Sequence, residues 1–265
     1  MKPTKKICLI IIAVSIAILL LIQILSPKIF DSSFLNDSIT TIVSRAIGTL
    51  IFSVLIAFLG FNVTKRMRFN RNTILFLLPG FIVAINNLPI VSILNKDANI
   101  TANSIEIVFF FIECVFVASF EETAFRGVLF PIMLKNKRGS VKEIFYTTLL
   151  SSAIFGFIHI VNLFEGASPI SVLMQVCYST LIGGMCAVVF LKTNNIFLCI
   201  SVHAIYNFCG QIVTRLGSGH IWNTTQIILT TFVGAICAAL IIGSLLKTST
   251  SETDYIYLNN KEIRS

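Results

Sequence analysis

Charged residues are scarce in this sequence, at 12% of its 265 positions. Soluble domains carry about a quarter, so the scarcity excludes an ordinary soluble enzyme, a disordered chain and a coiled coil. Acidic residues are fewer than basic ones: the sequence has 12 Asp and Glu against 20 Lys and Arg, which gives a net charge of +8. Because 55% of the residues are hydrophobic, the basic excess indicates cytoplasmic loops of a membrane protein rather than nucleic-acid binding.

Paired cysteine motifs are also absent. The seven cysteines are an odd number, include no Cys-x-x-Cys pair and all lie in apolar stretches. These features argue against a disulfide framework and against a thiolate zinc site, and predict small buried side chains instead. The seven are Cys8, Cys114, Cys177, Cys186, Cys199, Cys209 and Cys237.

What the sequence has in abundance is apolar runs of the length that crosses a bilayer, about 20 residues. Eight such runs can be placed, at 7–26, 41–63, 73–94, 105–134, 144–164, 170–191, 195–215 and 224–246. The first follows a basic start, but it is too long for a signal peptide and no small-x-small cleavage pattern precedes Pro27. The predicted fold class is therefore an all-α polytopic membrane bundle of about eight transmembrane helices.

The distribution of positive charge predicts the orientation of this bundle. Fifteen of the 20 Lys and Arg residues fall in the two ends and in alternate loops, and only Lys28, Lys96 and Arg215 fall in the opposite loops. Both termini are therefore expected in the cytoplasm. Basic loops also indicate access to the interior from that side, and the compact length favours a bacterial plasma membrane. The predicted division is helices 1–3 in 1–104, a core in 105–215, the last helix in 216–246 and a solvated cytoplasmic tail in 247–265.

Ionisable side chains inside apolar runs point to chemistry, because each costs about 2.5–3.5 kcal/mol at the bilayer centre. Glu122 and Arg126 are four residues apart and share a helix face, so we expect a structural ion pair. Glu121 points elsewhere on the same helix and is left without that partner. A carboxylate that is free to take a proton is a candidate general base. Three other ionisable residues belong to no motif and are expected to pair or to reach the interface: Arg45, Glu106 and Glu113.

Two histidines lie in later apolar runs, each with a partner one helical turn away. Phe155 and His159 share a face in the fifth run, as do His203 and Asn207 in the seventh. Glu121 and His159 lie about 20 Å from the predicted cytoplasmic ends of their helices. The corresponding depths of His203 and Asn207 are about 12 and 18 Å. The four polar groups are therefore predicted to surround one cavity near mid-membrane, although a lone membrane histidine is more often a helix–helix hydrogen-bond partner.

Three motifs occur in order on three apolar helices: Glu-Glu-x-x-x-Arg at 121–126, Phe-x-x-x-His at 155–159 and His-x-x-x-Asn at 203–207. In this arrangement the sequence resembles the CPBP intramembrane proteases, also called the Abi or type II CAAX prenyl endopeptidase family, over about residues 105–215. Members process CAAX proteins, mature peptides or act in bacteriocin immunity. The resemblance therefore implies a peptide or a lipid-modified protein as the substrate.

The resemblance also implies roles for individual residues. Glu121 and His159 would activate a water molecule that attacks the peptide bond. His203 and Asn207 would stabilise the oxyanion of the tetrahedral intermediate. Three further residues would support the site structurally: Glu122, Arg126 and Phe155.

Alternatives remain open at this point. Glu121, His159 and His203 are a legitimate zinc set, but the sequence has no His-Glu-x-x-His pair, so a glutamate mechanism without metal or cofactor is favoured. A non-enzymatic scaffold or immunity protein could bind a peptide or a membrane partner in the same cavity. An ion-coupled transporter would use the buried Glu and His as a proton relay, but no pair of broken helices in matching halves supports it.

Overall fold

The computed structural model describes residues 29–64, 71–137, 139–164 and 166–257. Its elements, in chain order, are α2 (Ser33–Leu59), α3 (Arg71–Asn86), α4 (Ile90–Leu94), β1 (Ala98–Ile100), α5 (Ser104–Glu122), η1 (Thr123–Leu129), α6 (Phe130–Leu134), α7 (Val141–Phe157), η2 (Ile158–Leu163), α8 (Pro169–Thr193), α9 (Ile196–Leu216), β2 (Gly217–Gly219), α10 (Thr224–Leu246) and α11 (Ser251–Asp254). Within this part of the chain, five helical segments are long and apolar enough to cross a membrane: α2, α7 with η2, α8, α9 and α10. The all-α polytopic bundle is confirmed, and the predicted run at 7–26 lies outside the described residues.

α5 runs without a break through η1 and α6, which matches the predicted run at 105–134. A capping box closes its first turn. Asn103 Oδ1 accepts a hydrogen bond from the Glu106 N–H at 3.0 Å, and Glu106 Oε2 accepts one from the Asn103 N–H at 3.2 Å. Glu106, which belongs to no motif, is therefore a helix cap.

Glu113 ties three helices together. Its two carboxylate oxygens lie 3.2 and 3.3 Å from Arg215 Nη2 at the end of α9. Ser38 Oγ of α2 donates a further hydrogen bond of 2.6 Å to the same carboxylate. The buried charge is thus paired and hydrogen-bonded, which is the condition for tolerating it inside a bundle.

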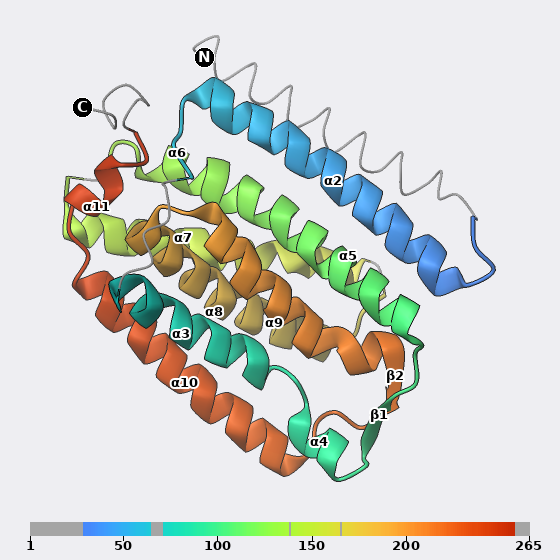
Figure 1. Cartoon of the computed structure of the whole chain (residues 1–265). Helices are drawn as coiled ribbons and strands as arrows, with labels where there is room; N and C mark the ends of the chain where they lie inside the picture. Colours follow the sequence, from blue (N-terminus) through green and yellow to red (C-terminus); the bar gives the residue numbers. More distant parts are fainter. Residues whose placement is uncertain (1–28, 65–70, 138, 165, 258–265) are drawn as a thin grey trace.

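α8 and α9 form the middle of the bundle. α9 contacts α3, α5 and α8, and α5 separates α9 from α2 (Figure 1). α7 and α10 both contact α8. The C-terminal half of α8 is the centre of the core, since every residue from 185 to 191 is no more than 3% exposed.

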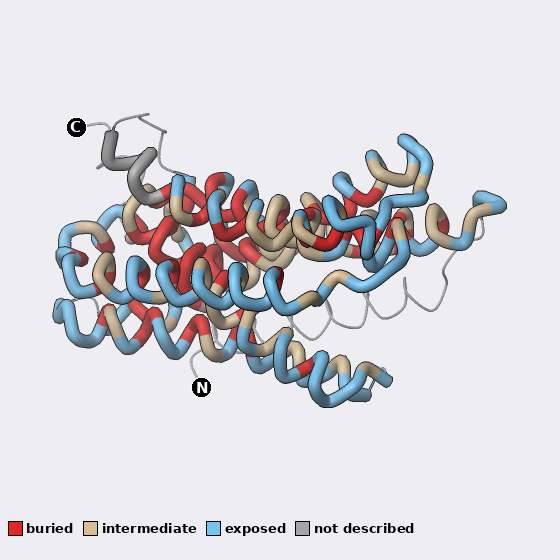
Figure 2. The backbone as a smooth tube through the Cα atoms, turned by 90° about the horizontal axis from the view of Figure 1, so that it is seen from below, coloured by how far each residue is buried: buried red, intermediate tan, exposed pale blue. Residues whose placement is uncertain are grey.

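The two ends of the bundle differ in construction. At the ribbon end, defined by β1, β2 and α4, the two strands pair antiparallel with Ala98 opposite Gly219 and Ile100 opposite Gly217 (Figure 1). The tail end is defined by α6, the start of α7 and α11 (Figure 1). Buried residues are concentrated in the half of the bundle nearer the tail end (Figure 2).

The predicted run at 73–94 is not one helix. α3 ends at Asn86, and the separate short helix α4 begins at Ile90. Pro89 explains the break, because proline has no N–H to donate and disfavours helical geometry in the residue before it. The break leaves Asn87 outside any helix, where its Nδ2 donates to the carbonyl oxygen of Tyr206 in α9 at 3.0 Å.

The expectation of a solvated tail is wrong for residues 247–257. Thr253 and Ile256 are fully buried. Tyr257 Oη donates a 2.7 Å hydrogen bond to the carbonyl oxygen of Pro131, and Lys192 Nζ lies 2.8 Å from Glu252 Oε2. Ile256 and Tyr257 hold residues 247–257 against the bundle. The polar composition of the surrounding residues gave no indication of this contact.

Most of the described cysteines are buried, as predicted, and the six described ones are free thiols. Cys177 is the exception, because its side chain is exposed on α8. Cys8 lies outside the described residues.

Gly156 lets α7 approach α8 closely. A Cβ at this position would collide with Thr180 Oγ1 and would lie 2.7 Å from the carbonyl oxygen of Val176. We expect Gly156→Ala to lower the free energy of unfolding by about 1–3 kcal/mol, the usual cost of overpacking. Thermal unfolding in detergent measures it. Gly184→Ala is the control, because its Cβ would meet nothing nearer than 3.6 Å; equal losses in both variants would contradict the steric explanation.

Candidate active site

The site is built at two irregular helical turns. Glu121 and Glu122 are the last residues of α5, and the π-helical segment η1 follows at Thr123. Wide turns of this kind inside helices frequently lie at functional sites. The end of α7 tightens into the 3₁₀ helix η2, which carries His159. The regular helix α9 carries the other two candidate residues, His203 and Asn207.

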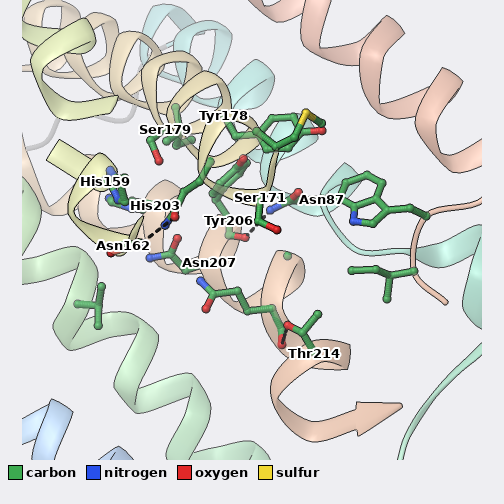
Figure 3. A pocket seen from close by; sticks show the side chains of 18 of the residues that line it. Asn87, His159, Asn162, Ser171, Tyr178, Ser179, His203, Tyr206, Asn207 and Thr214 are labelled. Atoms are coloured by element: carbon green, nitrogen blue, oxygen red, sulfur yellow. Dashed lines mark hydrogen bonds between the residues drawn. The ribbon is translucent and has the colours of Figure 1, made fainter. Parts of the chain in front are cut away.

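The structure brings all four candidate residues to one cavity of about 870 Å³. Glu121 comes from α5, His159 from η2, and His203 and Asn207 from α9. Figure 3 shows His159, His203 and Asn207 close together on the cavity wall. Three helical segments that are distant in sequence therefore converge at one cavity, and the membrane depth and the catalytic roles of these residues stay predictions.

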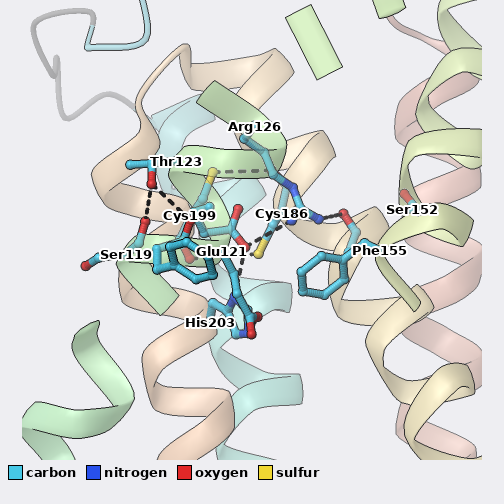
Figure 4. Close-up of polar contacts among 12 residues, drawn as sticks. Ser119, Glu121, Thr123, Arg126, Ser152, Phe155, Cys186, Cys199 and His203 are labelled. Carbon is cyan, nitrogen blue, oxygen red and sulfur yellow. Dashed lines mark hydrogen bonds and ion pairs between the residues drawn. The ribbon is translucent and has the colours of Figure 1, made fainter. Parts of the chain in front are cut away.

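Glu122 and Arg126 form the expected ion pair beneath this wall (Figure 4). Arg126 Nη1 lies 3.1 Å from Glu122 Oε1, and both side chains are 1% exposed. Arg126 Nη2 also donates a 2.6 Å hydrogen bond to the carbonyl oxygen of Gly183 in α8. Its guanidinium carbon lies 4.7 Å from the centre of the Phe155 ring. The pair thus joins α5, α7 and α8 with no exposure to solvent.

His203 stands between the two glutamates of α5 (Figure 4). Its Nδ1 is 2.8 Å from Glu122 Oε1, and its Nε2 is 3.5 Å from Glu121 Oε2. A carboxylate can only accept, so Nδ1 is the donor to Glu122. The ion-pair contact of Glu121 is therefore to His203, whereas the sequence paired Glu121 functionally with His159. Spacing along single helices could not reveal a contact between α5 and α9.

His159 is oriented by its own helix. Its Nδ1 is 3.0 Å from the carbonyl oxygen of Phe155. Because a carbonyl oxygen can only accept, Nδ1 carries the hydrogen and Nε2 is left as the acceptor of the neutral ring. The Phe155 ring packs edge-on against both histidines, with centroid distances of 5.6 Å to His159 and 5.7 Å to His203. Phe155 therefore fixes the relative position of the two imidazoles.

Asn207 offers the cavity an unused amide. Among the described residues its side chain has no hydrogen-bond partner. It is partly exposed one helical turn beyond His203. Its two N–H donors are therefore available to a bound group.

The cavity has further lining residues that no motif indicated. Arg45 of α2 lines it, with its guanidinium carbon 5.0 Å from the centre of the Phe120 ring and Nε buried without a hydrogen bond. Its position inside an apolar run was the only signal in the sequence. Neutral polar side chains complete the wall: Asn87, Asn162, Ser171, Gln175, Gln211 and Thr214. Such residues are common in any sequence, so only the fold could select them.

The alternative set of zinc ligands, Glu121, His159 and His203, does not have the arrangement that a zinc site needs. Among the described residues, no three His, Cys, Asp or Glu side chains are grouped closely enough to hold a metal ion. Glu121 and His203 are in contact, but the Phe155 ring packs against both imidazoles. We therefore derive no step through a metal.

The fold and the site define a polytopic membrane protein with a carboxylate, two imidazoles and an amide at one buried cavity. Residues 103–209 match the family model described as type II CAAX prenyl endopeptidase Rce1-like, so this segment is similar to that family. The match covers less than half of the 265-residue chain. No curated protein and no solved structure was found to match the chain.

The family match confirms the resemblance seen in the motifs. Its limits lie close to the expected 105–215, and it contains all four candidate residues. The family is one of proteases, and the match supports an intramembrane peptidase. α2, α10 and Asn87, which follows α3, lie outside the matched segment although each contributes to the lining of the cavity.

Proposed function

We propose that this protein is an intramembrane endopeptidase that hydrolyses a peptide bond of a peptide or membrane-associated substrate. The observation that carries the proposal is that Glu121, His159, His203 and Asn207 line one cavity in a domain of a protease family. Amide hydrolysis needs a base for water and donors for the oxyanion, and this set supplies both.

Glu121 is the general base in this proposal. Its side chain is 22% exposed, so water reaches it, whereas Glu122 is held by Arg126 at 1% exposure. His159 Nε2 accepts the second hydrogen of the attacking water, because Nδ1 is committed to the carbonyl oxygen of Phe155. The two groups together orient one water molecule.

His203 and Asn207 hold the oxyanion. His203 donates the hydrogen on Nδ1 to Glu122. A neutral imidazole has only one N–H, so His203 must be an imidazolium to donate a second hydrogen bond from Nε2 to the oxyanion. Glu122 stabilises that charge. Arg126, Glu122, His203 and Glu121 then alternate in sign and sum to zero, which limits the cost of burying four charges. The free amide of Asn207 supplies the second donor.

These residues account for every proton transfer in the reaction. Glu121 takes one proton from water as the hydroxide oxygen bonds to the peptide carbonyl carbon. The negative charge moves to the carbonyl oxygen, where His203 Nε2–H and the Asn207 amide stabilise it. When the C–N bond breaks, Glu121 returns its proton to the leaving amine. The products are a carboxylic acid and an amine, and transfer of the acid's proton to the amine gives a carboxylate and an ammonium group.

Several biological settings need this reaction, including CAAX-type processing, peptide maturation and bacteriocin immunity. The proposed location is a bacterial plasma membrane, where a peptide or lipid-modified protein would be the substrate.

The test is cleavage of a peptide library by the purified full chain, with and without a chelator, and with bound metal assayed. Specific cleavage that survives chelation in metal-free protein is the expected result. Activity lost on chelation and restored by zinc would overturn the metal-free mechanism while keeping the peptidase. No cleavage, together with a cellular phenotype that survives Glu121→Ala, would overturn the peptidase in favour of a scaffold.

A further inference from the structure

Arg45 brings a positive charge without an ion-pair partner to the cavity. It lies in the middle of α2, outside the segment that matches the protease family, and is the only Arg or Lys among the lining residues that the structure describes. Its Nε is buried without a hydrogen bond, and no carboxylate of the described residues lies within ion-pair distance of its guanidinium. A charged group inside a membrane bundle is costly unless it is paired, so the cavity has room for an acceptor at Arg45.

Two other arginines of the bundle show how such a cation is accommodated elsewhere in this fold. Arg126 lies 3.1 Å from Glu122, and Arg215 lies 3.2 Å from Glu113. Arg45 has no carboxylate of this kind, and a guanidinium cannot remove its charge by deprotonation. Its N–H donors are therefore available to a group that enters the cavity.

The ring of Phe120 holds the guanidinium of Arg45 in place. The guanidinium carbon lies 5.0 Å from the ring centre, which is the separation of a cation–π contact. Phe52, seven residues further along the same face of α2, packs edge-on against the same ring with the centroids 5.7 Å apart. Because Phe120 immediately precedes Glu121, these contacts fix the cation near the part of α5 that carries the candidate base.

The charges of the proposed active site balance without Arg45. In the proposed mechanism the alternating chain from Arg126 to Glu121 sums to zero. Arg45 then adds one positive charge to the lining of the cavity. A bound group that carries one negative charge would restore neutrality there, which lowers the cost of burying the cation.

We propose that Arg45 is the anion-binding residue of the cavity and that it takes a carboxylate of the peptide substrate, either the C-terminal carboxylate or an acidic side chain. A carboxylate accepts two parallel N–H bonds from one guanidinium, and such bonds are stronger away from bulk water. Arg45 selects and orients the substrate and takes no part in proton transfer. That the carboxylate belongs to a peptide to be cleaved rests on the proposed peptidase function, whereas anion binding at Arg45 does not.

Fluorescence of Trp222 measures binding without cleavage, because Trp222 is the single tryptophan of the chain and lines the cavity. Three peptides of one neutral sequence are titrated into the full-length Glu121→Gln protein in detergent: the C-terminal amide, the free acid, and the amide with glutamate as its last residue. We expect at least one carboxylate peptide to bind about 10- to 100-fold more tightly than the neutral amide. The peptide that does so identifies which carboxylate Arg45 takes, and adding Arg45→Gln should remove the difference.

Two further variants separate anion binding from a structural role. Arg45→Lys keeps the charge without the planar fork of donors and should keep part of the preference. Lys142→Gln is the control, because it removes an exposed cation in the first turn of α7, outside the lining of the cavity, and should keep all of it. Equal affinity for the three peptides, no binding of any of them, or a preference that survives Arg45→Gln would overturn the proposal. An equal loss of affinity for all three peptides in Arg45→Gln would also overturn it.

Cleavage of the same peptides by the wild-type protein distinguishes failure of this proposal from failure of the peptidase. The preference should lie in KM rather than in kcat, because the carboxylate is held equally in the bound substrate and in the transition state. Binding that depends on Arg45, with no cleavage of any peptide, would refute the peptidase and keep the anion site. Cleavage of all three peptides with equal KM, unchanged in Arg45→Gln, would refute the anion site and keep the peptidase.

Discussion

Glu121→Gln is expected to lower kcat for peptide cleavage by about 10²–10⁴-fold, the usual contribution of a general base. Glutamine has nearly the shape of glutamate and still faces His203 Nε2, 3.5 Å away in the structure, but it cannot take a proton from water. The fold should survive, because the buried ion pair of Glu122 and Arg126 is untouched. Steady-state cleavage by the two purified proteins measures the effect.

Glu143→Gln is the matched control for this change. Glu143 lies in the first turn of α7 at the tail end and is exposed. The same chemical substitution there should leave kcat within experimental error of the wild type. If Glu121→Gln kept full activity, or if both variants lost it equally, the assignment of Glu121 as the base would be wrong.

Arg126→Met is expected to give the largest loss of stability, about 3–5 kcal/mol, because it removes the guanidinium from the buried carboxylate of Glu122 and leaves His203 as the remaining partner. It also removes the 2.6 Å hydrogen bond to Gly183 and the stacking on Phe155. Methionine fills similar volume, so the loss reports on charge rather than on a cavity. The free energy of unfolding in detergent measures it.

Arg215→Met is the control for the second prediction. Arg215 also pairs with a glutamate, but its side chain is 38% exposed and Ser38 still donates to Glu113 after the change. Because Arg215 is exposed and Glu113 keeps a hydrogen bond, we expect a smaller loss than for Arg126→Met, whose ion pair is buried on both sides. Similar losses in the two variants would show that burial does not set the strength of the Glu122–Arg126 pair.

The motifs of single helices could be predicted because helix geometry is local. The four-residue spacing of Glu122 and Arg126 gave their ion pair, and the spacing of Phe155 and His159 gave a contact that the structure realises through the Phe155 carbonyl. Contacts between helices could not be predicted in this way. The position of His203 between Glu121 and Glu122 depends on how α9 packs against α5.

Two segments with irregular backbone also differ from what the sequence predicted. The sequence predicted one helix over 73–94, and Pro89 divides it; that break brings Asn87 to the cavity. The sequence predicted a solvated tail, and the burial of Ile256 fastens its first part to the bundle. In both cases one residue decides the local path, and average hydropathy over a window does not register it.

By itself, the sequence determined the membrane class, the all-α fold and the resemblance to a protease family over its middle segment, because hydropathy, helix periodicity and motif order are properties of the chain read in one dimension. Tertiary structure alone decided which glutamate His203 contacts and that Arg45 reaches the cavity. These depend on the side chains that meet between helices, which the spacing along a single helix does not specify.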